Sequence, residues 1–108
     1  MVPLNYMAKY FSNKQIVKML QEISAAYQAK GENRFKVIAY DNAAASIELA
    51  TSELKDLWED NKLDTVPGLG ESIRKHLDEL FKTRKVAHFE AVKKDLPEGM
   101  FDLLQIGG

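Results

Sequence analysis

The strongest constraint on the fold of this chain is a tight turn at residues 66–70, with the sequence V-P-G-L-G. Pro67 ends any preceding helix, because its ring fixes φ and leaves no N–H to donate. The two glycines can adopt positive φ and carry no Cβ that would keep a neighbour away. An amphipathic run follows directly, with apolar residues at the spacing of one buried helix face, namely Ile73, Leu77 and Leu80. The sequence therefore predicts a turn that leads straight into a helix.

The expected helix at 71–83 begins in a way that suits phosphate binding. Its first N–H groups have no intrahelical partner, and the aligned peptide dipoles place partial positive charge at that end. With Leu69 between the glycines and Val66 before the proline, the pattern predicts a helix-hairpin-helix motif. Such a hairpin contacts the nucleic-acid backbone without reading the bases. The alternative is a turn that only joins two helices.

Composition excludes several classes of site. The 108 residues include no cysteine and two histidines, so disulfides and thiolate metal sites are excluded and a zinc site is not expected. No apolar segment approaches the length of a membrane span, and the N-terminus lacks the apolar block of a signal peptide. We therefore expect one cytoplasmic, monomeric domain without a membrane partner, associated with the nucleoid if the source is bacterial or archaeal.

The net charge of −1 does not by itself indicate a nucleic-acid partner. The charges are unevenly distributed, however. Residues 71–94 carry seven Lys or Arg against four Asp or Glu, whereas residues 52–64 carry two against five. One basic and one acidic face are compatible with modest, salt-sensitive binding to a phosphate backbone.

Two long helices are expected before the hairpin. Ser12 and Gln15 have the spacing of a capping box at the start of a helix over about 13–30. Asn33 is expected to cap a second helix over about 34–50, with an apolar stripe along one side. A run of three alanines in this second helix removes side-chain bulk, so another helix can pack closely against it.

Shorter elements complete the prediction. Ser52 is expected to cap a short helix, and Leu63 is expected to pack beneath the hairpin in a helical turn. Amphipathic segments predict one more helix at 86–94 and a final turn at 100–104. Because no alternating apolar pattern is long enough for a strand, the fold is predicted to be all-α, a small helical bundle that contains the helix-hairpin-helix motif.

Few residue patterns indicate catalysis. The sequence has no Walker loop, no Ser-His-Asp arrangement and no paired Asp-x-Asp for two metals. A lysine in a basic pocket can attack an aldehyde sugar and eliminate through a Schiff base, and Lys36, near Tyr40, and Lys75 are candidates. His76 lies beside the buried face of the hairpin helix, where packing is the simpler interpretation and a phosphate contact the alternative.

Four segments follow one another in a recognisable order. They are K-G-E-N-R-F-K at 30–36, A-Y at 39–40 before an alanine-rich helix, V-P-G-L-G-E-S-I at 66–73 and L-P-E-G-M at 96–100. Together they resemble the N-terminal domain of X-family DNA polymerases, more the bacterial and archaeal branch than vertebrate DNA polymerase beta. The resemblance covers residues 13–106, which leaves 1–12 as an N-terminal extension. It implies a helical bundle that holds the 5′-phosphate side of gapped or nicked duplex DNA in base excision repair, attached to a polymerase domain.

The resemblance also implies roles for individual residues. In the family, the hairpin amides contact phosphate. Lys36 and Tyr40, on the helix expected over about 34–50, match residues that help to hold the 5′-phosphate. The expected DNA-binding residues are Lys36, Tyr40, Gly68, Leu69, Gly70, Ser72, Arg74 and Lys75. The family hairpin also holds a monovalent cation, which bridges to a DNA phosphate, so Na⁺ or K⁺ is the one expected cofactor. Its ligands here are expected to be the backbone carbonyls of Asp64, Val66 and Leu69.

In the vertebrate polymerase this domain removes a 5′-deoxyribose phosphate through a Schiff-base lysine, and the resemblance places that position on His76. An imidazole cannot form the imine. Phosphate-binding lysines of the family fall on Ser72 and Asp64, and the histidine at the pocket mouth falls on Phe35. Lys75 is about 100° around the helix from the nucleophile position and should point elsewhere.

No catalytic residue is therefore assigned, and three functions are carried forward. The leading one is a DNA-binding module of an X-family polymerase. The second is a 5′-deoxyribose phosphate lyase that uses Lys36 or Lys75. The third is a protein-interaction domain in which the hairpin has only a structural role, in keeping with the weak net charge.

Overall fold

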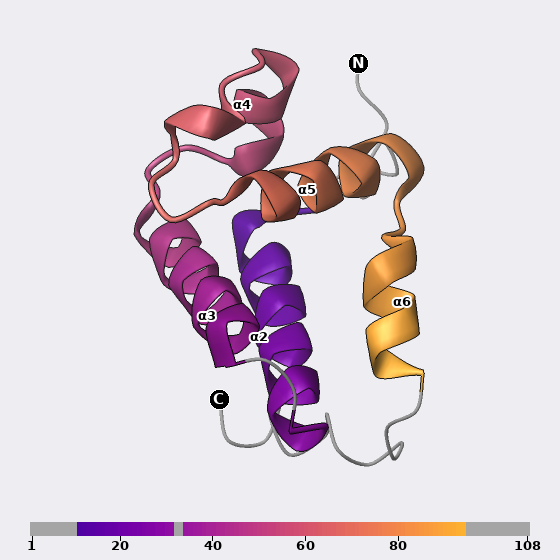
Figure 1. Cartoon of the computed structure of the whole chain (residues 1–108). Helices are drawn as coiled ribbons and strands as arrows, with labels where there is room; N and C mark the ends of the chain where they lie inside the picture. Colours follow the sequence, from indigo (N-terminus) through magenta and orange to yellow (C-terminus); the bar gives the residue numbers. More distant parts are fainter. Residues whose placement is uncertain (1–10, 32–33, 95–108) are drawn as a thin grey trace.

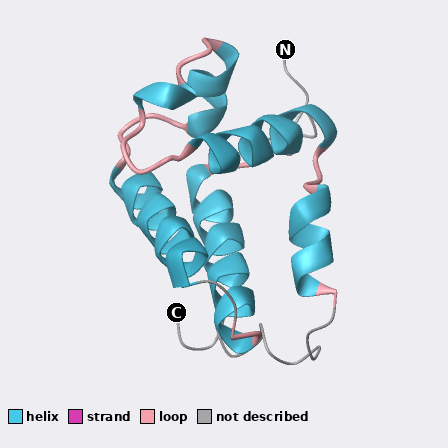
Figure 2. Ribbon diagram, viewed as in Figure 1, coloured by secondary structure: helices cyan, strands magenta, loops and turns pink. Residues whose placement is uncertain are grey.

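The computed structural model describes residues 11–31 and 34–94, and this part of the chain consists of helices joined by loops and turns, without a strand (Figure 2). Its elements are α2 (Asn13–Ala29), α3 (Arg34–Leu49), α4 (Leu54–Glu59), the 3-10 turn η1 (Leu63–Thr65), α5 (Glu71–Thr83) and α6 (Ala87–Lys93). The all-α prediction is confirmed. The Asn33 cap, the turn at 100–104 and residues 1–10 of the N-terminal extension lie outside the described residues. None of the described helices is long and apolar enough to cross a membrane.

The bundle is built on an antiparallel pair, α2 and α3, which pack along their length (Figure 1). The chain then forms α4 and η1 at one end of this pair, and α5 lies across that end. α6 turns back and runs alongside α2. The hairpin at 66–70 therefore lies where α3 ends and α5 begins.

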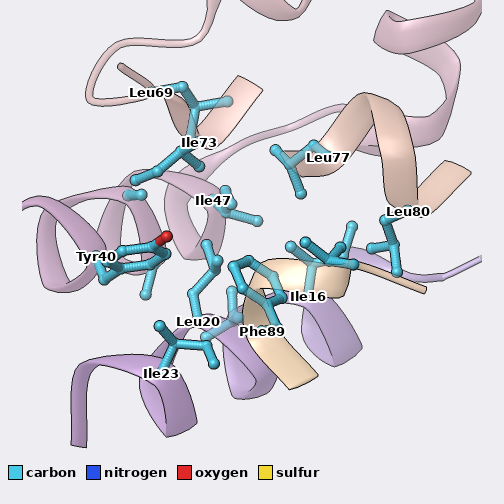
Figure 3. Packing of buried hydrophobic residues seen from close by; sticks show 14 of the residues in the cluster. Ile16, Leu20, Ile23, Tyr40, Ile47, Leu69, Ile73, Leu77, Leu80 and Phe89 are labelled. Atoms are coloured by element: carbon cyan, nitrogen blue, oxygen red, sulfur yellow. The ribbon is translucent and has the colours of Figure 1, made fainter. Parts of the chain in front are cut away.

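The core draws apolar side chains from every long helix (Figure 3). It includes Ile16, Leu20 and Ile23 of α2, Tyr40 and Ile47 of α3, Ile73, Leu77 and Leu80 of α5 and Phe89 of α6, with Leu69 of the hairpin. The predicted stripe of α5 is thus the buried face. In α3, Ala43 and Ala44 are buried, as the small-residue argument requires, whereas Ala45 faces solvent.

The predicted capping box of α2 is confirmed. The Ser12 hydroxyl accepts from the Gln15 N–H at 3.2 Å, and the Gln15 side chain accepts from the Ser12 N–H at 2.8 Å. Two donors that the helix cannot satisfy internally are thereby paired. The helix ends at Ala29 with Lys30 as its C-cap, and Gly31 adopts a positive φ of 66°.

The predicted Ser52 cap of α4 is wrong, because the N-cap residue is Glu53 and its side chain makes no capping bond. The cap comes instead from α2. The Asn13 side-chain oxygen accepts from the Leu54 N–H at 2.7 Å, and its amide nitrogen donates to the Ser52 carbonyl at 2.8 Å. A single side chain, distant in sequence, therefore ties the start of α4 to the start of α2.

The two helices on either side of the hairpin are linked by Trp58. Its indole N–H donates to Asp78 of α5 at 2.8 Å, and its ring stacks on Phe81 with a centroid distance of 5.2 Å. The hydrogen bond from Trp58, followed by that from Lys82, holds the pKa of Asp78 below its usual value. Leu63 is buried in η1, as predicted.

Candidate nucleic-acid interface

The hairpin places its two glycines in different surroundings. Gly68 adopts a φ of +84°, and a Cβ built on it would collide with the Ser46 hydroxyl and lie 3.4 Å from the backbone oxygen of Asn42. Both neighbours belong to α3. The absence of a side chain at Gly68 therefore allows the hairpin to pack directly on α3, which is a structural requirement.

Gly70 has no such requirement. Its φ of −70° is open to any residue, and nothing lies within 4 Å of the position that a Cβ would take. It is the N-cap of α5, and no side chain caps that end of the helix. An exposed helix N-terminus with open space beside it is accessible to an anion.

Leu69 is only 5% exposed, so its side chain belongs to the core and only its backbone can take part in binding. Its carbonyl accepts a hydrogen bond from the Arg74 guanidinium at 3.3 Å. This carbonyl is one of the three expected to hold a monovalent cation, with those of Asp64 and Val66. The cation site stays a prediction, but in the structure a fixed positive charge already contacts one of its ligands.

The polar residues in the first turns of α5 face three directions. Ser72 lines a pocket shared with α3 and α6, whereas Arg74 lines a separate hollow of about 190 Å³ next to Trp58 and Asp64. Lys75 lies in neither, and its ammonium is 3.5 Å from the carboxylate of Glu71 in a solvent-exposed pair. The expectation that Lys75 points away from the nucleophile position agrees with this placement.

The pocket beside Ser72 brings predicted residues together from two helices far apart in sequence. Its volume is about 380 Å³. Its lining includes the predicted DNA-binding residues Lys36, Tyr40 and Ser72, the His76 at the nucleophile position, and two residues that sequence reasoning missed, Tyr27 and His88. We refer to it below as the α3–α5–α6 pocket. Phe35, expected at its mouth, does not line it and is 80% exposed.

Two histidines meet in this pocket. The rings of His76 and His88 stack in parallel, with centroids 4.8 Å apart and an interplanar angle of 3°. The Nε2 atom of His88 is 2.5 Å from the hydroxyl of Tyr27. Burial lowers the pKa of His76, and the neighbouring His88 lowers it further, whereas Glu79 acts in the opposite sense.

The other groups in the pocket are a cation and a neutral phenol. The Lys36 ammonium lies 5.2 Å from the centroid of the Tyr27 ring, a cation–π distance. Burial is the largest cause that raises the pKa of Tyr40, and Tyr27 adds to it. Tyr40 therefore keeps its proton at neutral pH, and its hydroxyl is hydrogen-bonded to Tyr27, a bond that a phosphate oxygen would replace.

His88 reaches the pocket because of how α6 begins. The side chain of Glu79, on α5, accepts from the Ala87 N–H at 2.8 Å and so fixes the first turn of α6. Phe89 and Val92 then face the core, as predicted, and His88 lies beside that face. The one sequence signal that could have indicated His88 is its position directly before Phe89, a residue that was predicted to face the core.

No group of three or more His, Asp or Glu side chains that could hold a metal is found within residues 11–31 and 34–94. The acidic residues around α4 are engaged differently. Lys55 lies 3.6 Å from carboxylate oxygens of both Asp56 and Glu59, and the two carboxylates are largely exposed. This is the solvated acidic face expected from the sequence.

Comparison with known proteins identifies the family. Residues 11–86 match the family model described as a helix-hairpin-helix domain. The chain is also 30% identical over 95 residues to the DNA polymerase/3′-5′ exonuclease PolX of Bacillus subtilis (strain 168). That alignment covers 88% of this chain, which spans 16% of the length of the relative. The resemblance to X-family polymerases is confirmed, and the chain belongs to the helix-hairpin-helix domain family.

Proposed function

We propose that this domain binds duplex DNA at gaps or nicks, with the hairpin on the phosphate backbone and the 5′-phosphate in the α3–α5–α6 pocket. It would act as a module of an X-family polymerase in base excision repair, in the cytoplasm and at the nucleoid. The observation that carries the proposal is the convergence of Lys36, Tyr40 and Ser72 in one pocket next to the hairpin. Family membership and the similarity to PolX support it.

The chemistry of the pocket suits a phosphate monoester. Lys36 supplies a positive charge, and the hydroxyls of Tyr40 and Ser72 supply neutral donors. Ser72 lies in the first turn of α5, whose N-terminus contributes a partial positive charge. The same helix end thus connects the pocket with Gly70 and the hairpin, so that one strand could contact both.

The surface charges support modest affinity. Lys75, Lys82 and Lys93 each lie within 4 Å of a carboxylate, on Glu71, Asp78 and Glu22 respectively. The pairs of Lys75 and Lys82 are exposed and therefore weak, so a DNA phosphate can compete with their carboxylates, whereas the Lys93–Glu22 pair is partly buried. We therefore expect binding that falls as salt concentration rises.

The test is fluorescence anisotropy of the domain on a gapped duplex with a downstream 5′-phosphate and on the same duplex with a 5′-hydroxyl, at several salt concentrations. Tighter binding to the phosphorylated gap, weakened by salt, is the expected result. Equal binding to the two duplexes would rule out a 5′-phosphate site. If the domain does not bind DNA even at low salt, the result would favour a hairpin with only a structural role and a protein as the partner.

The alternative function is a 5′-deoxyribose phosphate lyase, and the pocket reduces its two candidate lysines to one. Lys75 does not line the pocket, so Lys36 is the lysine that a sugar aldehyde could reach there. Borohydride trapping on an abasic 5′ end tests this. The wild type is expected to give no covalent adduct, whereas His76→Lys, which places an amine at the position implied by the family, is expected to give one. A wild-type adduct lost in Lys36→Ala would establish the lyase instead.

A further inference from the structure

The rings of His76 and His88 pack against Phe89, with centroids 5.2 and 6.4 Å from it, and they also line the pocket of the proposed phosphate site. Both side chains are half-buried, lie parallel at a centroid distance of 4.8 Å and line the pocket that also holds Lys36. Two uncharged imidazole rings can stack at this distance. Two imidazolium rings at this distance would repel each other. The pair is therefore arranged so that its charge depends on what else enters the pocket.

We propose that His76 and His88 form a proton-dependent clamp for a terminal phosphate. The pair takes up a proton as a phosphomonoester enters the α3–α5–α6 pocket, so selectivity for a 5′-phosphate increases as pH falls from 8.5 to 6.5. The proposal rests on the proposed function, because the pocket must be the site that receives the 5′-phosphate. It assigns His88, which lies beyond the matched segment 11–86, to the binding site.

The charges around the pair explain the direction of the effect. Burial and the neighbouring His88 both oppose a charge on His76, whereas Glu79 favours it, and Lys36 is the cation that lines the same pocket. A dianionic phosphate within about 4–6 Å reverses this balance, because an opposite charge favours the protonated imidazole. Tyr27, Tyr40 and Ser72, which also face the pair, contribute hydroxyls without a charge.

Tyr27 holds the ring of His88 in place. The Nε2 atom of His88 is 2.5 Å from the Tyr27 hydroxyl. This pairing leaves Nδ1 as the ring nitrogen that a phosphate oxygen can contact. Tyr27 is 2% exposed and held in α2, and Glu79 fixes the start of α6. The orientation of His88 is therefore set before the ligand arrives.

The experiment measures the affinity ratio between 5′-phosphorylated and 5′-hydroxyl gapped duplexes at pH 8.5, 7.5 and 6.5 and at constant ionic strength. Because an opposite charge favours the protonated imidazole, the ratio is expected to rise by about fivefold to tenfold across this range. The phosphate itself has a second pKa of about 6, so it loses charge as pH falls. Its own titration would reduce the ratio, and a rise must come from the protein.

Variants and calorimetry assign the proton. The double variant His76→Gln/His88→Gln is expected to abolish the pH-dependent rise, because either ring of the pair can carry the proton, whereas His76→Lys, with a fixed charge, should show a high ratio at pH 8.5 that does not increase further. Lys18→Ala, an exposed lysine of α2 outside the pocket, is the control and should keep the wild-type slope. Calorimetry of the wild type near pH 7, in buffers of different ionisation enthalpy, should show uptake of about half to one proton.

The outcomes separate this inference from the function on which it rests. A wild type that does not distinguish the two duplexes at any pH refutes the proposed function. A wild type that prefers the phosphorylated gap equally at all three pH values, with no proton uptake, overturns the histidine clamp and leaves the function standing. Because the calorimetric measurement uses the wild type, it decides the question even where a variant does not fold.

Discussion

The hairpin and the α3–α5–α6 pocket are built in opposite ways. The hairpin is one continuous pentapeptide, and its two glycines have separate roles, since Gly68 packs on α3 and Gly70 stays open to solvent. The pocket takes its polar groups from four helices, including Lys36 of α3 and His88 of α6. A continuous motif can thus combine folding and binding in adjacent residues, whereas a pocket assembled from distant residues depends on the whole bundle.

The largest effect is expected for Gly68→Val, which tests whether the hairpin must pack on α3. A β-branched residue at a φ of +84° is strained, and its Cβ would collide with Ser46. Strain and overpacking together should lower the free energy of unfolding by about 3 kcal/mol. Urea unfolding measures this loss. A variant of near wild-type stability would show that Gly68 is not needed for packing on α3.

Gly70→Val tests the contact of the hairpin with phosphate and is the matched control for Gly68→Val. Its backbone conformation and open surroundings accept a side chain, so stability should change by less than about 1 kcal/mol. The side chain would screen the N-terminus of α5 from phosphate, and DNA affinity is expected to fall by about tenfold. Lys94→Ala, on the exposed end of α6, should change affinity by less than about twofold. Equal losses from all three variants would contradict the hairpin interpretation.

Asp78→Ala should lower the free energy of unfolding, because Asp78 links α5 to α4. It should leave the preference for a 5′-phosphate unchanged. Loss of the bond from Trp58 is expected to cost about 1 kcal/mol at pH 7. The pKa of Asp78 is lowered in the folded protein, so its contribution is present above the unfolded pKa of about 3.9 and is lost as pH falls through the lower folded value. Urea unfolding at pH 7 and pH 3 should therefore show a smaller difference from the wild type at pH 3.

The control for that measurement is Asp56→Ala, which removes a largely exposed carboxylate from the Lys55 pair and should change stability little. A stability difference for Asp78→Ala that is as large at pH 3 as at pH 7 would show that the charge of Asp78 has no part in the link between α4 and α5.

The smallest effect concerns the cation expected at the hairpin. Because Arg74 already contacts the Leu69 carbonyl, replacing K⁺ by tetramethylammonium at constant ionic strength should change wild-type DNA affinity by less than about twofold. In Arg74→Ala the same exchange should have a larger effect, since the carbonyl is then available to an ion. Strong dependence on K⁺ in the wild type would instead favour the cation at Asp64, Val66 and Leu69.

Local signals in the sequence were sufficient for most elements of the fold. The capping box of Ser12 and Gln15, the stripe of α5 and the Pro-Gly turn each lie within a few residues, and the structure confirms them. The Ser52 cap failed because the acceptor for the Leu54 N–H comes from Asn13, about forty residues earlier. A local rule cannot anticipate a side chain that tertiary packing brings to a helix end.

The residues of the candidate site also fall into two groups, those that the sequence indicated and those that only tertiary packing brings together. The resemblance to X-family polymerases pointed to Lys36, Tyr40 and Ser72, and the structure brings these three residues together in one pocket. It did not indicate His88 as a partner of His76, because their contact depends on the angle between α5 and α6. Nor did it separate Gly68 from Gly70, since the residue that distinguishes them, Ser46, belongs to another helix.

The most direct test of the account is a double-mutant cycle between Lys36 and the 5′-phosphate. Affinities of the wild type and Lys36→Ala are measured by anisotropy on gapped duplexes that end in a 5′-phosphate or a 5′-hydroxyl, with Lys18→Ala as the control lysine. The account predicts a coupling of about 1.5–3 kcal/mol for Lys36 and almost none for Lys18. An equal loss on both duplexes in Lys36→Ala, with no coupling, would contradict the assignment of the pocket as the 5′-phosphate site.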